Sequence, residues 1–148
     1  MTTIIGTGIS GLVGSRITEL LSADFSFEEI SRSTGIDITD NRSVLQKISS
    51  SNSPFVLHLA AKADVDGCEL DKPLGVNGDA WKINVIGTKN IADACLQTGK
   101  KLLYISTDFV FDGEKADGYT EEDMPNPINW YAETKYEGEK IVSALSSP

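Results

Sequence analysis

A glycine-rich turn near the N-terminus constrains the fold of this chain more than any other feature. The segment Ile5–Gly14 joins a β-rich run, Thr2–Gly6, to apolar residues that recur at helical spacing. Gly8, Gly11 and Gly14 form GxxGxxG, and the turn also satisfies GxGxxG. Glycine there permits a tight turn, a close approach to a pyrophosphate and close packing of the helix on the strand. The context predicts a dinucleotide-binding turn, and the alternative is a glycine-rich turn that holds no ligand.

Strands and helices alternate along the rest of the chain. The continuously apolar run Phe55–Ala60 is typical of a buried parallel strand. Gly99 is placed to end a long helix, and Asp64–Asp79, which holds Pro73 and three glycines, is expected to be irregular. The other expected elements are strands at Phe27–Ser31 and Lys101–Ser106, helices at Leu12–Leu21, Arg42–Ser49, Trp81–Gln97 and Tyr131–Leu145, and loops at Ser49–Pro54 and Gly113–Asn129.

This alternation predicts an α/β fold: a doubly wound, Rossmann-type parallel sheet with helices on both faces. Only about four strands are visible, and the chain stops after a helix, where such a sheet should continue. We therefore expect residues 1–148 to form an NAD(P)-binding domain from which the substrate domain is absent. The fourth strand is then expected to be an unpaired edge that favours self-association.

Composition narrows the classes of partner. The formal net charge of −9 argues against a nucleic acid or an anionic membrane as the main partner, whereas backbone N–H groups at a helix start can still hold a pyrophosphate. The N-terminus has no secretory pattern and no apolar run reaches the ~20 residues of a membrane span, so a cytoplasmic protein is expected. Cys68 and Cys95 stand alone, and no metal site is predicted. The single histidine, His58, is expected to be a structural or cofactor-side residue.

The residues after the second predicted strand bear on the choice of cofactor. An acidic residue at this strand end would favour the free ribose hydroxyl of NAD. Ser31 and Arg32 lie there instead, and Arg32 can pair with a 2′-phosphate. The pattern therefore favours NADPH over NADH, with a solvated surface arginine as the alternative.

A tyrosine and a lysine four residues apart suggest carbonyl chemistry. Tyr131 and Lys135 form YxxxK on a predicted helix, so that phenol and ammonium share one face. A free tyrosine has a pKa of about 10, and a nearby cation stabilises its phenolate. Tyr131 can then deliver a proton to a carbonyl oxygen while Lys135 binds the nicotinamide ribose. Ser106 and Thr107 add hydroxyls at the end of the fourth strand, where open α/β sheets bind ligands.

In this order, these motifs resemble the extended short-chain dehydrogenases/reductases over essentially the whole chain. The stretch Thr7–Gly14 resembles the TGxxGxxG of that family, His58–Ala61 a segment that lies along the cofactor, and Asn84–Thr88 an NVxGT helix. The most specific stretch, Ser106–Gly113, is similar to STDYVFDG of the dTDP-4-dehydrorhamnose reductases, and Tyr119–Pro127 also resembles that group.

The resemblance implies hydride transfer from NADPH or NADH to the 4-keto group of a dTDP-linked deoxysugar, in the synthesis of dTDP-rhamnose, by a dimeric enzyme. The implied catalytic residues are Thr107, Tyr131 and Lys135. Residues expected at the nucleotide-sugar substrate are Ser106, Thr107, Asp108, Phe109 and Tyr131. Those expected at the cofactor are Gly8, Ile9, Ser10, Gly11, Leu12, Val13, Arg32, Asp37, Leu59, Ala60, Ala61, Tyr131 and Lys135.

The chain departs from the family pattern at several points. Lys62 stands where a small or aromatic residue is usual, Asp66–Asp79 matches loosely, and family members are roughly twice as long. An epimerase or dehydratase of the same family is one alternative, although Phe111–Gly113 differs from the Tyr-Gly typical of such epimerases. A non-catalytic cofactor-binding module is the other.

Overall fold

The structure is a computed structural model that describes residues 1–145. Four strands and six α-helices follow one another along this part of the chain. They are β1 (Thr2–Thr7), α1 (Leu12–Leu21), β2 (Phe25–Ile30), α2 (Asn41–Ser50), β3 (Phe55–His58), α3 (Val65–Asp71), α4 (Asp79–Trp81), α5 (Thr88–Thr98), β4 (Lys101–Tyr104) and α6 (Trp130–Leu145).

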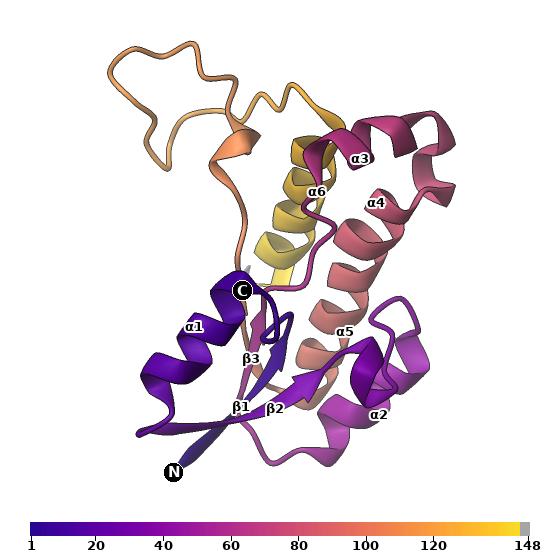
Figure 1. The fold of residues 1–148 in the computed structure, drawn as a ribbon, viewed down its shortest axis with the longest axis vertical. Helices are drawn as coiled ribbons and strands as arrows, with labels where there is room; N and C mark the ends of the chain where they lie inside the picture. The colour runs from indigo at the N-terminus through magenta and orange to yellow at the C-terminus, as the bar shows by residue number, and fades with distance from the viewer. Residues whose placement is uncertain (146–148) are drawn as a thin grey trace.

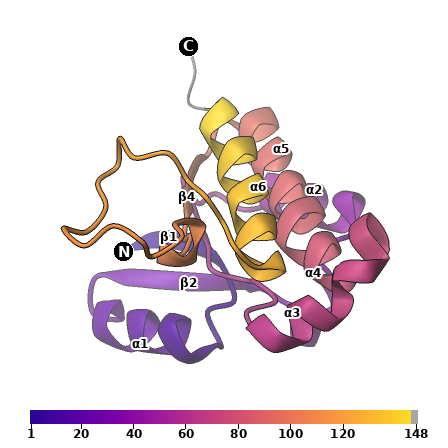
Figure 2. The same ribbon diagram turned by 90° about the horizontal axis from the view of Figure 1, so that it is seen from above.

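The strands form one parallel sheet in the order β2-β1-β3-β4. β1 lies in the interior of the sheet, and Thr7, its last residue, is in register with Ile30 of β2 and His58 of β3. Helix α1 covers one face, whereas α2, α5 and α6 lie on the other (Figures 1 and 2). The predicted doubly wound parallel sheet is therefore confirmed.

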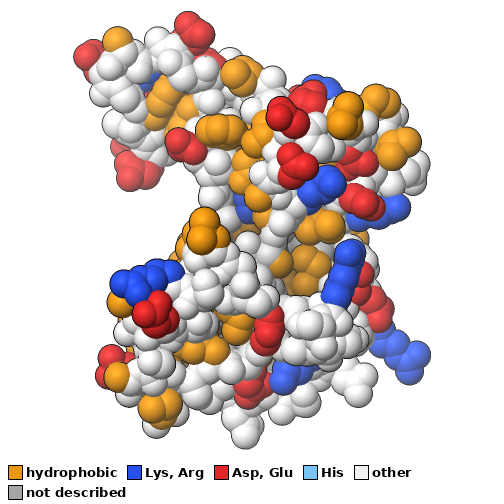
Figure 3. All heavy atoms as spheres, viewed as in Figure 1, with side chains coloured by type: hydrophobic (Ala, Val, Ile, Leu, Met, Phe, Trp, Pro, Cys, Tyr) orange, Lys and Arg blue, Asp and Glu red, His pale blue; other side chains and the backbone are white. Residues whose placement is uncertain are grey.

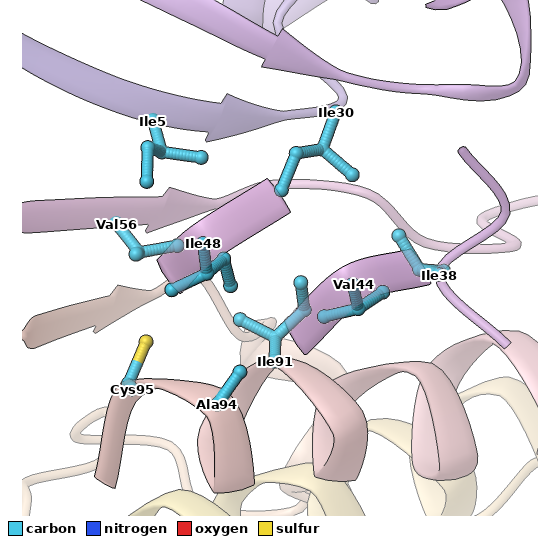
Figure 4. Close-up of a cluster of buried hydrophobic side chains, with 9 residues drawn as sticks. All are labelled: Ile5, Ile30, Ile38, Val44, Ile48, Val56, Ile91, Ala94 and Cys95. Atoms are coloured by element: carbon cyan, nitrogen blue, oxygen red, sulfur yellow. The ribbon is translucent and has the colours of Figure 1, made fainter. Parts of the chain in front are cut away.

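A cluster of apolar side chains holds the sheet against α2 and α5 (Figure 4). β1, β2 and β3 contribute Ile5, Ile30 and Val56, which point toward Ile48 and Ile91 on the helices. Each fully buried aliphatic side chain contributes roughly 1.5–3 kcal/mol to stability. This packing fixes the strand ends from which the functional loops leave.

The prediction that Asp64–Asp79 is irregular was wrong. Helix α3 begins after Asp64, whose side chain accepts a hydrogen bond from the Gly67 N–H and caps the helix. A 3₁₀ segment, Lys72–Asn77, then leads to α4. Tertiary contacts support these short elements, because Cys68 is buried and the Asp71 carboxylate accepts a bond from the Ala80 N–H. Of the glycines that predicted a loop, Gly67 lies within α3, Gly75 at a kink in the 3₁₀ segment and Gly78 at the cap of α4.

The predicted helix Trp81–Gln97 is longer and less regular than expected. Helical structure runs from α4 through a π-helical turn, Lys82–Gly87, into α5, and ends at Gly99, which has a φ of +67°. Gly99 is thus the left-handed cap that the sequence predicted. The π-helical turn surrounds the buried Asn84, and apolar periodicity alone does not reveal such a turn.

One face of the sheet stays partly uncovered beside α1. Phe55, Leu103 and Ile105 are 39%, 61% and 42% exposed there. Of the apolar residues whose helical spacing predicted α1, Leu12 is 92% exposed and Leu20 is also exposed. β4 is an edge strand of the sheet formed by residues 1–145, as predicted. None of the helices described for this chain is long and apolar enough to cross a membrane.

Candidate active site

The glycine turn brings β1 and α1 close to the end of β3. Gly8 has a φ of +67°, and a Cβ added to it would lie 2.7 Å from the Ala60 backbone nitrogen. The turn is closed by the Gly11 N–H, which donates to the Gly8 carbonyl over 3.1 Å. No side chain within residues 1–145 caps the start of α1. The free N–H groups of its first turn therefore offer a site for a phosphate.

Arg32 and Asp37 meet at the rim of a cavity of about 340 Å³ next to this turn. The Arg32 Nε donates to the Asp37 carboxylate over 2.9 Å. Asp37 also accepts bonds from the backbone N–H and hydroxyl of Thr39, and these bonds, followed by Arg32, hold the pKa of its carboxyl below the usual range. Because the ion pair uses Nε, the terminal guanidinium nitrogens stay open to another anion. Gly8, Ser10 and Ala60 line the same cavity.

The other residues predicted at the cofactor lie around the glycine turn, and the crevice between this turn and the end of β3 is where the cofactor is expected. Leu12 and Val13 form the exposed first turn of α1, while the Ile9 side chain is buried below the turn. The Leu59 N–H donates to the Thr7 carbonyl over 3.1 Å, which extends the pairing of β3 with β1. Ala61 is partly buried.

Lys135 lies in α6 and reaches the end of β4. Its Nζ donates to the Ile105 carbonyl over 2.7 Å and lies 4.2 Å from the centre of the Tyr104 ring. Burial lowers the pKa of Lys135 to about 8, against a smaller opposing effect of Glu139. The buried Lys135 cation is thus held at the carbonyl of Ile105, which precedes Thr107 by two residues.

Tyr131 lies one helical turn before Lys135 and contacts the loop that leaves β4. Its ring packs edge-to-face against Phe109, with ring centres 6.2 Å apart. Thr107 accepts a bond from the Phe109 N–H and thereby caps the 3₁₀ turn Asp108–Val110. The half-buried Thr107 hydroxyl also donates to the Asp108 carboxylate over 3.3 Å, so it has a turn-capping role in addition to its place at the strand end. The Ser106 hydroxyl oxygen is buried with no hydrogen-bond partner in residues 1–145.

The loop that follows Phe111 carries acidic residues that the structure ties together. Lys115 pairs with Asp123 over 2.6 Å, and hydrogen bonds from Tyr119, then Asn126, lower the pKa of Asp112 to about 2. Within the described part of the chain, no group of three or more His, Cys, Asp or Glu side chains is placed to hold a metal ion. The surface is hollowed between this loop and α1 (Figure 3).

Asn84 and Tyr104 are residues of this region that the predicted site omitted. Asn84 donates to the Lys62 carbonyl over 3.1 Å and to the Thr134 hydroxyl over 2.9 Å, and so ties the segment after β3 to α6. Tyr104 donates to the Lys135 carbonyl over 3.3 Å. The resemblance of Asn84–Thr88 to an NVxGT helix was the available sequence signal for the first, Asn84. Nothing in the sequence marked the second.

The buried lysine predicts a pH dependence of stability. Because its pKa falls to about 8, the unfolded chain binds more protons than the folded chain between about pH 8 and the ordinary lysine pKa of about 10.4. Burial of the charged Lys135 ammonium destabilises the folded chain by its full amount below pH 8. This destabilisation disappears as pH rises through the window. We expect Lys135→Met to raise the free energy of unfolding at pH 7 by about 1–2 kcal/mol. This figure already subtracts the stability lost with the hydrogen bond to the Ile105 carbonyl.

Urea unfolding of both proteins at pH 7, 9 and 10.5 checks this expectation. The difference between Lys135→Met and the parent chain should shrink as pH rises. Lys82→Met, which removes an exposed lysine, is the control and should show a small, constant difference. A Lys135→Met protein that is less stable at every pH would contradict the expectation.

Comparison with known proteins identifies close relatives of the whole chain. The family model of the RmlD substrate binding domain matches residues 1–147. The dTDP-4-dehydrorhamnose reductase of Aggregatibacter actinomycetemcomitans is 31% identical over 99% of this chain and 48% of its own length. The crystal structure of the dTDP-4-dehydrorhamnose reductase of Bacillus anthracis, in complex with NADP, is 36% identical. It superposes with a TM-score of 0.87 over 98% of this chain and 50% of that chain.

A relative with a different name matches a shorter stretch. The methionine adenosyltransferase 2 subunit beta of Rattus norvegicus is 36% identical over 72% of this chain and 30% of its own length. The chain thus spans about half the length, or less, of the relatives that it matches.

Proposed function

Because this chain belongs to the RmlD substrate binding domain family, we propose that it is the cofactor-binding half of an NAD(P)H-dependent reductase of a dTDP-linked 4-ketosugar. One observation carries the proposal. Lys135 bonds to Ile105 and Tyr131 packs on Phe109, so the helix with the tyrosine and lysine meets the strand-end hydroxyls at the edge of the sheet where the glycine turn lies. Relatives named dTDP-4-dehydrorhamnose reductase support the substrate class.

The residues divide the chemistry among them. The bound cofactor supplies hydride to the carbonyl carbon. Tyr131 gives its phenolic proton to the carbonyl oxygen, and the Thr107 hydroxyl orients that oxygen by a hydrogen bond. The Lys135 ammonium stabilises the phenolate that remains and binds the ribose of the nicotinamide. With Lys135 held at the Ile105 carbonyl, the cation stays at the strand end where this charge develops.

We propose NADPH as the preferred cofactor, with NADH also accepted. The preference is supported by Arg32, which Asp37 anchors at the rim of the cavity beside Gly8, where we propose that the adenosine of the cofactor binds. Terminal guanidinium nitrogens suit a 2′-phosphate, whereas the neutral ribose hydroxyl of NADH gains little from them.

Arg32→Ala is expected to weaken NADPH binding by about tenfold and to leave NADH binding nearly unchanged. A charge-assisted hydrogen bond to a phosphate contributes about 1.5–3 kcal/mol, and the exposure of Arg32 places the effect at the lower end. Fluorescence titration of the isolated chain with each cofactor measures both constants. Arg42→Ala, an exposed arginine on α2, is the control. Equal losses of affinity for NADPH and NADH would show that Arg32 does not bind the 2′-phosphate.

We propose that a further half of the enzyme binds the sugar nucleotide and covers the bare face of the sheet. The exposed side chains of Phe55, Leu103 and Ile105 support this assignment, as does the free edge of β4. Relatives about twice as long as this chain support it independently. The dimeric and cytoplasmic state implied by the family resemblance is part of the same proposal.

The function is tested by fusing residues 1–148 to the half of the Bacillus anthracis reductase that this chain does not match. We expect the isolated chain to bind NADPH without measurable turnover of dTDP-4-dehydrorhamnose, and the fusion to consume NADPH when that sugar is added. Robust steady-state turnover by the isolated chain would contradict the proposal of a separate substrate half. A folded fusion that binds both ligands but does not react would contradict the reductase proposal.

The second candidate is a cofactor-binding subunit that carries out no reduction. It is favoured by the similarity to a relative whose name is that of a methionine adenosyltransferase subunit and not that of a reductase. The same fusion separates the two candidates, because a binding subunit would hold NADPH with unchanged affinity and show no burst of oxidation in a single-turnover experiment.

A further inference from the structure

A chain of buried hydrogen bonds runs through His58 from the glycine turn to the π-helical turn. The imidazole Nδ1 lies 2.6 Å from the Thr7 hydroxyl, and Nε2 lies 3.0 Å from the Thr88 hydroxyl. The Thr7 hydroxyl in turn accepts a bond from the Ala60 N–H over 3.1 Å, and the Thr88 hydroxyl donates to the Asn84 carbonyl over 2.7 Å. His58, Thr7 and Thr88 are fully buried.

The outer partners fix the direction of each bond. A backbone carbonyl cannot donate, so the single hydroxyl proton of Thr88 goes to Asn84, and Thr88 must accept from His58 Nε2. His58 Nε2 therefore carries the proton. A backbone N–H cannot accept, so Thr7 accepts from Ala60, and the Thr7 hydroxyl proton finds an acceptor at His58 only if Nδ1 carries no proton. The histidine that satisfies every partner is the neutral Nε2–H tautomer.

The surroundings of the ring keep it neutral. Burial and the nearby Lys135 cation lower the pKa of His58 to about 3. The other titratable group that packs against it is Tyr104, whose ring centre is 5.6 Å away, and burial raises the pKa of that phenol. No group described around the ring supplies a negative charge that would favour imidazolium.

We propose that His58 is a positioning residue: as the neutral Nε2–H tautomer it holds Thr7, and through it Gly8, against Ala60, and thereby sets the depth of the crevice that takes the pyrophosphate. Thr7 directly precedes Gly8, which lies so close to Ala60 that no Cβ fits between them. The same bonds reach Asn84, which holds α6 through Thr134. The effect on the cofactor rests on the proposed function, whereas the tautomer does not.

The tautomer is tested by NMR of the isolated chain labelled with ¹⁵N-histidine, in which the single histidine gives one set of ring signals. We expect a pyridine-like shift at Nδ1 and a protonated, pyrrole-like shift at Nε2, both unchanged between pH 5 and 8. The opposite tautomer, or an imidazolium signal in this range, would overturn the assignment whether or not the chain binds a cofactor.

Two substitutions test the positioning role by preserving opposite halves of the network. His58→Asn keeps an acceptor near the place of Nδ1 and preserves the bond from Thr7, whereas His58→Gln keeps an N–H near the place of Nε2 and preserves the bond to Thr88. We expect His58→Gln to weaken NADPH binding by about tenfold and His58→Asn by about threefold or less, since one hydrogen bond separates them. Urea unfolding of both reports stability.

Equal affinities in two folded variants would mean that the Thr7 bond does not set the crevice, and would overturn the proposal. If either variant fails to fold, Thr7→Val supplies a second comparison. It removes the hydrogen bond between Thr7 and His58 by deleting the threonine hydroxyl instead of the imidazole. It should match the affinity loss of His58→Gln. If the parent chain shows the Nε2–H tautomer but no NADPH binding, the proposed function fails while the hydrogen-bond assignment stands.

Discussion

Tyr131→Phe is expected to lower the turnover of the fused enzyme by about 10²–10⁴-fold, the usual range for loss of a general acid. The substitution removes only the phenolic hydroxyl and preserves the ring that packs edge-to-face against Phe109. The affinity for NADPH should therefore stay nearly unchanged. Single-turnover rates measure the chemical step, and fluorescence titration measures binding.

The matched control is Tyr136→Phe, which removes a phenolic hydroxyl from the same helix, where the ring lies beneath Lys140 instead of at the strand ends. This variant should retain the parent rate. If Tyr131→Phe reacts as fast as the parent, Tyr131 is not the proton donor and the division of roles proposed above is wrong.

Gly8→Ala is expected to destabilise the fold and to remove most of the cofactor affinity. The left-handed conformation of Gly8 costs an alanine about 1–2 kcal/mol. The added Cβ would also lie 2.7 Å from the Ala60 nitrogen, a backbone atom that cannot move alone, and such overpacking costs about 1–3 kcal/mol more. Separation of the turn from β3 should weaken NADPH binding by about tenfold or more, because the N–H groups of the turn lose their alignment.

Gly99→Ala is the control for backbone strain. Gly99 has the same φ of +67°, yet nothing lies within 4 Å of an added Cβ. It should lose stability to the conformational penalty alone and bind NADPH as the parent does. Urea unfolding and fluorescence titration separate the two effects. Similar affinities in both variants would show that contact with Ala60 is not what shapes the turn.

The parts of the fold that depend on local pattern were predictable. The apolar run at Phe55, the glycine turn and the cap at Gly99 are set by local sequence, and all three are present, although β3 ends at His58 and not at Ala60. The segment around α3 was not predictable. Its short helices depend on contacts with distant residues, such as the bond from the Trp130 N–H to Glu69. Tertiary contacts override weak local preference there.

The residues of the candidate site could be predicted from the sequence, but the hydrogen bonds and ion pairs that hold them in place could not. The YxxxK spacing placed Tyr131 and Lys135 on one helix, yet the bond of Lys135 to the Ile105 carbonyl depends on how α6 crosses β4. The pairing of Arg32 with Asp37 likewise depends on the turn between β2 and α2.

The interior position of β1 has a consequence for the order in which this protein forms. β1 precedes both of its partners in the chain: β2 follows about twenty residues later and Phe55–His58 about fifty residues later, and every strand pairing is parallel. One edge of β1 can pair early with β2, whereas its other edge needs the more distant β3, and this long-range pairing slows folding and leaves that edge open to wrong partners. Truncation or internal initiation beyond Thr7 would remove a strand from the middle of the sheet and leave β2 without a neighbour.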